Sequence, residues 1–134
     1  MVRNYRSREG EATGVDTKTQ LTTLGSETAP GPLLVPSGVS KLVGVIAAFC
    51  ENFAAATSFS AFIRLEGSGL PEGPEVIAVG AGGVPVATGG NASVPAKMYK
   101  LGVKVTPANE ILIFAEMAGT DVGQVSVAVT LIFE

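Results

Sequence analysis

Few residues in this sequence could do chemistry, and their types exclude the commonest catalytic and metal-binding arrangements. The chain has no histidine and a single cysteine, Cys50. Without histidine neither a Ser-His-Asp nor a Cys-His arrangement can form, and the commonest ligand of transition metals is missing. One cysteine can build neither a zinc site nor an intrachain disulfide. We therefore predict no catalytic residue, no metal site and no cofactor, and we expect Cys50 to be a small buried hydrophobic residue.

Carboxylates are the remaining groups with catalytic potential, and six of the twelve gather around two loops. They are Glu66, Glu72, Glu75, Glu110, Glu116 and Asp121. A glycosidase needs two carboxyl groups about 5 to 9 Å apart in a cleft, and nothing in this spacing predicts such a pair. We expect solvated charges at loops and strand ends, except for Glu116. That residue interrupts an apolar strand, so we expect it on the solvent or interface face, paired with a lysine across the sheet. The chain is thus predicted not to be an enzyme and to take no small-molecule substrate.

The glycine-rich stretch GAGGVPVATGGNAS (80–93) can be compared with phosphate-binding loops. Such a loop needs Gly-Lys-Ser/Thr at the start of a helix, and this stretch has no lysine and no helical pattern after it. The dinucleotide fingerprint fails as well, because Pro85 stands where its third glycine belongs. We predict a long surface loop that joins two strands. Asn91 lies in a glycosylation sequon, but no apolar secretory segment is visible at the N terminus.

The composition favours a protein that associates with others. Apolar residues make up 46% of the 134 residues and charged residues only 16%, against about 25% in an average soluble domain. A surface so poor in charge promotes association. The net charge of −3 has the wrong sign for a general nucleic-acid binder. Copies of the chain itself are the expected partners.

From residue 32 onward the apolar residues recur with the period of two that is typical of β-strands. Six clear strands are predicted at 41–50, 58–67, 75–80, 98–105, 110–119 and 124–133. Weaker extended segments are predicted at 20–24, 32–36 and 84–87, and 51–58 could form one helical turn. Turns rich in Gly, Pro, Asn and Asp separate the strands. The pattern predicts an all-β protein, an antiparallel β-sandwich of the jelly-roll kind over residues 32–134.

The final strand, VSVAVTLIFE (125–134), is apolar at every second position. We expect its odd-numbered residues to face the core. Ala128 and Ile132, on the other face, indicate that this second face is partly covered too. The segment 41–50 is apolar on both faces, as in a strand covered on both sides.

Residues 1–31 are polar and are predicted to form an extended N-terminal arm. Arg3, Tyr5, Arg6 and Arg8 are the candidate assembly residues of this arm. The arginines could contact nucleic acid, an acidic lipid surface or an acidic patch of a neighbouring subunit, and the neighbouring subunit is the favoured partner.

The layout of the chain resembles that of single jelly-roll viral capsid proteins. The stretches that carry the resemblance are VRNYRSREGEATG (2–14), SGVSKLVGVIAAF (37–49) and ANEILIFAEMAGTDVGQVSVAVTLIFE (108–134). The resemblance implies a structural subunit of a virion shell built from many copies, in which arms reach under or across neighbours. It also implies contacts with other virion proteins and a location in the virion.

A second hypothesis is a subunit of an extracellular or surface filament, in which an N-terminal segment is inserted as a strand into the next copy. QLTTL (20–24) and PLLVP (32–36) are the candidate donor strands. A third class, the ligand-binding trimeric jelly roll, needs a groove with convergent aromatic or charged residues, and the sequence predicts none.

Overall fold

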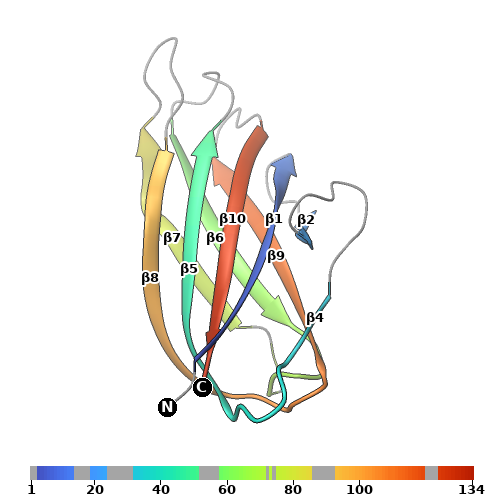
Figure 1. The fold of residues 1–134 in the computed structure, drawn as a ribbon. Coiled ribbons are helices and arrows are strands. Elements are labelled where there is room, and N and C mark those ends of the chain that lie inside the picture. The colour runs from blue at the N-terminus through green and yellow to red at the C-terminus, as the bar shows by residue number, and fades with distance from the viewer. Residues whose placement is uncertain are drawn as a thin grey trace.

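Two antiparallel β-sheets packed face to face make up the protein (Figure 1). The computed structural model describes residues 3–13, 19–23, 32–51, 58–71, 73, 75–85, 93–119 and 124–134. The strands in these ranges are β1 (Asn4–Thr13), β2 (Thr19–Gln20), β3 (Thr22–Thr23), β4 (Leu33–Leu34), β5 (Lys41–Glu51), β6 (Ser58–Glu66), β7 (Glu75–Pro85), β8 (Ser93–Lys104), β9 (Glu110–Gly119) and β10 (Gln124–Phe133). None of the described residues is helical, so none lies in a helix that could cross a bilayer.

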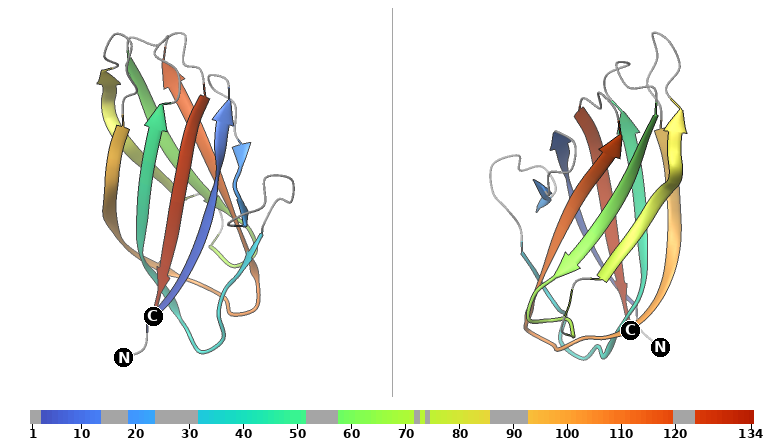
Figure 2. Two further views of the ribbon diagram at one scale, coloured as in Figure 1. Left: turned by 45° about the horizontal axis from the view of Figure 1, so that its top comes forward. Right: turned by 180° about the vertical axis from the view of Figure 1, so that it is seen from behind.

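The strand order is that of a jelly roll. The front sheet has the order β3-β1-β10-β5-β8, and the back sheet has the order β2-β9-β6-β7, with β4 also pairing with β9 (Figure 2). The strand pairs are nested along the chain. The outermost pair is β1 with β10, followed inward by β2 and β4 with β9, then β5 with β8, and β6 with β7 is the innermost. A long hairpin rolled up in this way gives the two Greek keys of the double-sheet jelly roll. The predicted all-β antiparallel sandwich is confirmed.

The N-terminal segment differs from the expected arm. Asn4–Thr13 pairs with β10 at ten consecutive positions, from Asn4 opposite Phe133 to Thr13 opposite Gln124. These residues are therefore a strand of the sandwich, which begins at residue 4 and not at residue 32. Of the expected arm, residues 1–2, 14–18 and 24–31 lie outside the described ranges.

The sequence hides β1 because its core-facing positions carry no large apolar residue. Residues directly opposite each other in an antiparallel pair point to the same face of the sheet. Arg6, Arg8 and Gly10 lie opposite Leu131, Val129 and Val127, all of which are buried. These three residues of β1 therefore belong to the inner face, but they show none of the alternating hydrophobic pattern that predicts a strand. Backbone pairing with β10 places the segment instead.

The core lies between the two sheets, and its buried members among the described side chains are aliphatic residues and Phe133. Its largest fully buried side chains are Phe133, Leu21, Leu33, Leu42, Ile63, Leu65, Ile111, Ile113 and Leu131. The predicted inner face of the last strand is confirmed, because Val127, Val129, Leu131 and Phe133 are at most 3% exposed. Tyr99, Leu101 and Val103 of β8 are partly buried against this cluster.

Strand β5 is buried on one face and half-buried on the other. Leu42, Val45 and Ala47 are fully buried in the core, whereas Ile46 and Ala48 are half-buried on the outer side. The register of β5 with both of its neighbouring strands shifts between Leu42 and Gly44. This bulge lets Leu42 and Val45, an even and an odd position, face the same core.

The glycine-rich stretch is in part a strand and not a surface loop. Strand β7 continues through residues 80–85 to Pro85, paired with β6, and β8 begins at Ser93, five residues before the predicted start. The prediction failed because the small residues of this segment have no alternating pattern, while their backbone can still pair. Residues 86–92, with the sequon Asn91, and residues 52–57 of the expected helical turn lie outside the described ranges, as does the side chain of Cys50.

Candidate assembly surface

The four N-terminal candidate residues do not form one cluster, because β1 sends them to different sides. Tyr5 lies opposite Ile132 on the outer face of the front sheet and is 53% exposed. Arg3 precedes the strand and its Nε atom donates to Oε1 of Glu134 at 3.2 Å. This hydrogen bond raises the pKa of Arg3 above its ordinary value. Because the Arg3 side chain is half exposed, solvent screens the pair strongly.

Arg6 and Arg8 lie on the inner side of β1, at the margin of the sandwich. Arg8 is half-buried and donates to the carbonyl oxygens of Ser7 at 2.7 Å and of Pro32 at 3.4 Å. Burial lowers the pKa of Arg8 from its ordinary value. Arg6 remains exposed and donates to the carbonyl of Tyr5 at 2.9 Å. Inward-pointing charges of this kind at a sheet margin hinder the docking of a further strand.

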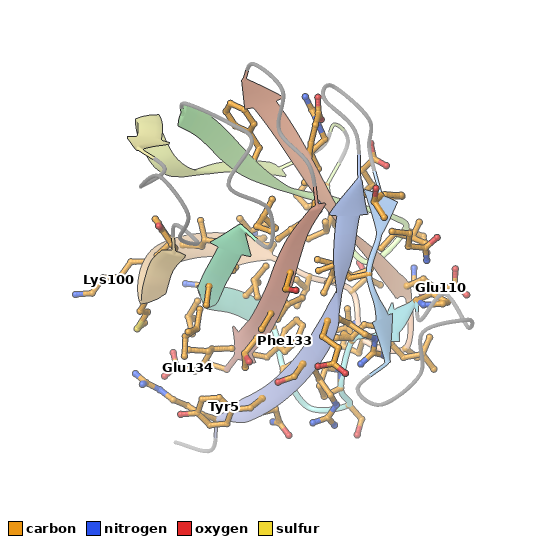
Figure 3. The ribbon with its side chains drawn as sticks, turned by 90° about the horizontal axis from the view of Figure 1, so that it is seen from above. Tyr5, Lys100, Glu110, Phe133 and Glu134 are labelled. Carbon is orange, nitrogen blue, oxygen red and sulfur yellow. The ribbon has the colours of Figure 1, made fainter. Side chains whose placement is uncertain are left out.

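The outward side chains of β1, β10, β5 and β8 form three rows across the front sheet, which we call the front face. The first row is Tyr5, Ile132, Gly44 and Lys100. The second row is Ser7, Thr130, Ile46 and Met98. The third row is Glu9, Ala128 and Ala48. Tyr5 and Lys100 project from the two flanking strands of these rows (Figure 3).

The centre of the front face is apolar and tightly packed. Ile132 is only 2% exposed although it points outward. A Cβ atom added at Gly44 would lie 2.9 Å from Cε of Met98 and 3.5 Å from Cδ1 of Ile132, so both side chains lean over that glycine. The partial cover that the sequence predicts for the second face of β10 is thus confirmed at Ile132, whereas Ala128 is exposed.

Polar contacts secure the edge of this face. The hydroxyl groups of Ser7 and Thr130 are 2.7 Å apart and share a hydrogen bond across β1 and β10. At the lower end, the carbonyl of Glu134 accepts hydrogen bonds from the backbone N–H groups of Ser40 at 2.8 Å and Lys41 at 3.0 Å. Contacts within the chain therefore hold this edge of the front face in place.

The outer side of the back sheet, which we call the back face, mixes apolar rings with an ion pair. Its described members on β6 and β9 are Phe62, Arg64, Glu66, Leu112, Phe114 and Glu116, all half-buried. Nε of Arg64 donates to Oε2 of Glu116 at 2.6 Å. Glu116 thus has the cross-strand partner that was expected, but the partner is an arginine and not a lysine. Among these features of the back face, only the ion pair had a recognisable signal in the sequence, which was the position of Glu116 within an apolar strand.

The other carboxylates do not assemble into a site in the part of the chain that the structure describes. Glu66 lies opposite Leu112 on the back face, and the exposed Glu110 begins β9 at the margin (Figure 3). Glu72 and Asp121 lie outside the described ranges, and Glu75 is placed only as the first residue of β7. The described residues contain no group of three or more His, Cys, Asp or Glu that could hold a metal ion.

The front face has no direct signal in the sequence, because this face depends on strand register. Ile46, Met98 and Ile132 are far apart in the sequence. Only the pairing of β10 with β5 and of β5 with β8 brings them together. The signal that was available was the apolar character of 41–50 on both faces.

Comparisons with known proteins give similarity at the level of structure. No family model and no curated protein matches the chain. The chain is similar to the PRD1 vertex protein P5, with 12% sequence identity, 95% of each chain covered and a TM-score of 0.46. It is also similar to a chain of the structure of infectious bursal disease virus, Gx strain, with 13% identity and a TM-score of 0.35, covering 96% of this chain and 36% of that one. Because the likeness is this distant, the jelly-roll assignment rests on the strand order.

Proposed function

We propose that this chain is a structural subunit that assembles with copies of itself through the outer faces of its sandwich, and that the assembly is a virion shell. The role is structural and not enzymatic. Other virion proteins are further partners, and the virion is the proposed location. The N-terminal segment contributes to assembly through Tyr5 on the front face and through the exposed Arg3 and Arg6 at the margin.

The observation that carries the proposal is that both outer faces of the sandwich present large apolar side chains. An antiparallel sheet with one face in water normally shows polar residues on that face. Here the front face has Tyr5 at 53% and Met98 at 42% exposure, beside the half-buried Ile46. The back face has the half-buried Phe62 and Phe114. Contiguous exposed apolar surface marks an interaction site in a stable protein.

Two faces on opposite sides of one subunit allow it to contact more than one neighbour. A subunit with a single contact surface stops at a dimer, whereas two different surfaces extend the assembly and can close it into a shell. The low charge of the chain fits this arrangement, since much of the surface would be covered by other copies.

The filament hypothesis finds less support. Its candidate donor segments are already paired within the chain: Gln20 lies opposite Phe114, and Leu34 lies opposite Glu110. Leu21 and Leu33, the apolar residues that a donor strand would offer to a neighbour, are 0% exposed in their own core. Release of either segment would open the sandwich.

Electron microscopy of the purified full-length chain tests the proposal. We expect closed particles of uniform size at micromolar concentration. Isolated sandwiches would overturn the proposal, and open fibres would replace the shell with the filament. Phe62→Glu on the back face should prevent particle formation without unfolding the protein, with Ser37→Glu, a substitution at an exposed turn residue, as the matched control.

A further inference from the structure

The front face is complementary to itself in shape. Met98 on β8 is a long apolar side chain with 42% of its surface exposed. On the opposite side, the third row consists of Ala128 and Ala48, whose side chains are short, and Ala128 is exposed. The face therefore has a projection at β8 and a shallow area at β10 and β5.

The front face is also complementary to itself in charge. Lys100 is exposed on β8 at one end of the first row, and Glu9 lies on β1 at one end of the third row. These two residues occupy opposite corners. Three strand spacings across the sheet and four residues along it separate them, which is about 14 Å in each direction.

Lys100 and Glu9 are separated by equal distances along and across the strands. A two-fold axis in the plane of the front face, along the diagonal that does not join these two residues, therefore exchanges their positions. A second copy rotated about this axis places its Glu9 over Lys100 and its Lys100 over Glu9. The same rotation places Met98, which leans toward Gly44, over Ala128 of the partner subunit. Opposite charges meet at both corners, and the projection meets the shallow area twice.

We propose that two copies of this chain pack front face to front face about this axis, with Lys100 of each copy opposite Glu9 of the partner subunit and Met98 on Ala128 of the partner subunit. This inference rests on the proposed function and names one of its contacts. A shell would then be built from such pairs, joined through other surfaces.

The area available is sufficient for a specific contact. Four strands at about 4.8 Å spacing and ten residues at about 3.4 Å each give a face of roughly 650 Å². A standard interface buries about 800 Å² on each partner. The front face therefore lies within the range of roughly 600 to 1,000 Å² that specific interfaces bury on each partner.

Charge reversal and mixing test the pairing directly. Lys100→Glu places two carboxylates together at each corner, and Glu9→Lys places two ammonium groups together. Each single variant should weaken the dimer by about tenfold or more at low ionic strength, measured by sedimentation velocity over a concentration series. An equimolar mixture of the two variants should restore the wild-type affinity, because both corners then join opposite charges. A chain that carries both substitutions should also have the wild-type affinity.

Lys104→Glu is the matched control. It makes the same charge change at an exposed residue of the same strand, but Lys104 lies beyond the three rows, opposite Lys41. We expect no change in affinity. Ala128→Arg fills the shallow area at an exposed residue and should abolish the dimer even if Glu9→Lys fails to fold.

The outcomes separate this inference from the proposed function. Wild-type protein that assembles while both charge reversals leave its affinity unchanged overturns the front-face pairing and leaves the proposed function standing. Single variants that weaken association without rescue on mixing also overturn it, since a different occupant would then cover the face. Wild-type protein that stays monomeric overturns both.

Discussion

Replacing Leu21 by alanine tests whether the N-terminal segment belongs to the sandwich or is an arm. Leu21 lies between β2 and β3, is 0% exposed, and its backbone N–H donates to the carbonyl of Ile113 at 2.8 Å. Its Cδ2 atom would lie 3.2 Å from a Cβ atom added at Gly10, so it packs directly on β1. An arm detached from the body would show none of these contacts.

The expected loss follows from that burial. Removing a fully buried leucine side chain lowers the free energy of unfolding by about 2 to 5 kcal/mol. A domain of this size has roughly 5 to 15 kcal/mol in total, so the variant should lose a large share of its stability. Leu34→Ala is the matched control, because Leu34 is 58% exposed and the same substitution there should cost within about 0.5 kcal/mol of zero.

The assay is urea unfolding followed by far-ultraviolet circular dichroism. All proteins are compared at one concentration, because association shifts the apparent stability. We expect the midpoint of Leu21→Ala to fall well below that of Leu34→Ala, with equal slopes. Coinciding midpoints would mean that Leu21 is not packed in the sandwich, and residues 19–23 would then belong to the arm that the sequence indicated.

Two further predictions concern the end loops and the back face. Gly67→Ala should lower the free energy of unfolding by about 3 kcal/mol or more, since Gly67 has φ +126° and an added Cβ would lie 2.4 Å from the carbonyl oxygen of Glu110. Gly38→Ala, at φ +79° with open space around it, should lower it by only about 1 kcal/mol. Equal losses in the two variants would argue against the close approach of Gly67 to Glu110. A double-mutant cycle on Arg64 and Glu116, whose side chains are 32% and 21% exposed, should give a coupling of about 0.5 to 1 kcal/mol that weakens with salt; zero coupling at low salt would mean that the pair does not form.

Sequence patterns predicted the strands whose inner faces are aliphatic. Ile63 and Leu65 of β6, and Val129 and Leu131 of β10, were assigned to the core from their period of two, and each is at most 1% exposed. The class of fold followed from such strands and from the turns between them.

The remaining elements could not be predicted because backbone pairing, and not side-chain pattern, places them. Strand β1 has Arg6, Arg8 and Gly10 on its inner side, and the second half of β7 is made of small residues. On the front face, only the register of the three strands β8, β5 and β10 brings Met98 and Ile132 together. Such long-range pairing has no local signal in the chain.

The molar mass of the purified 134-residue chain, measured by light scattering across a concentration series, shows whether the chain assembles with copies of itself. We expect a mass many times that of the 13.6 kDa chain at micromolar concentration, with smaller species on dilution. A mass of one chain throughout the series would contradict it.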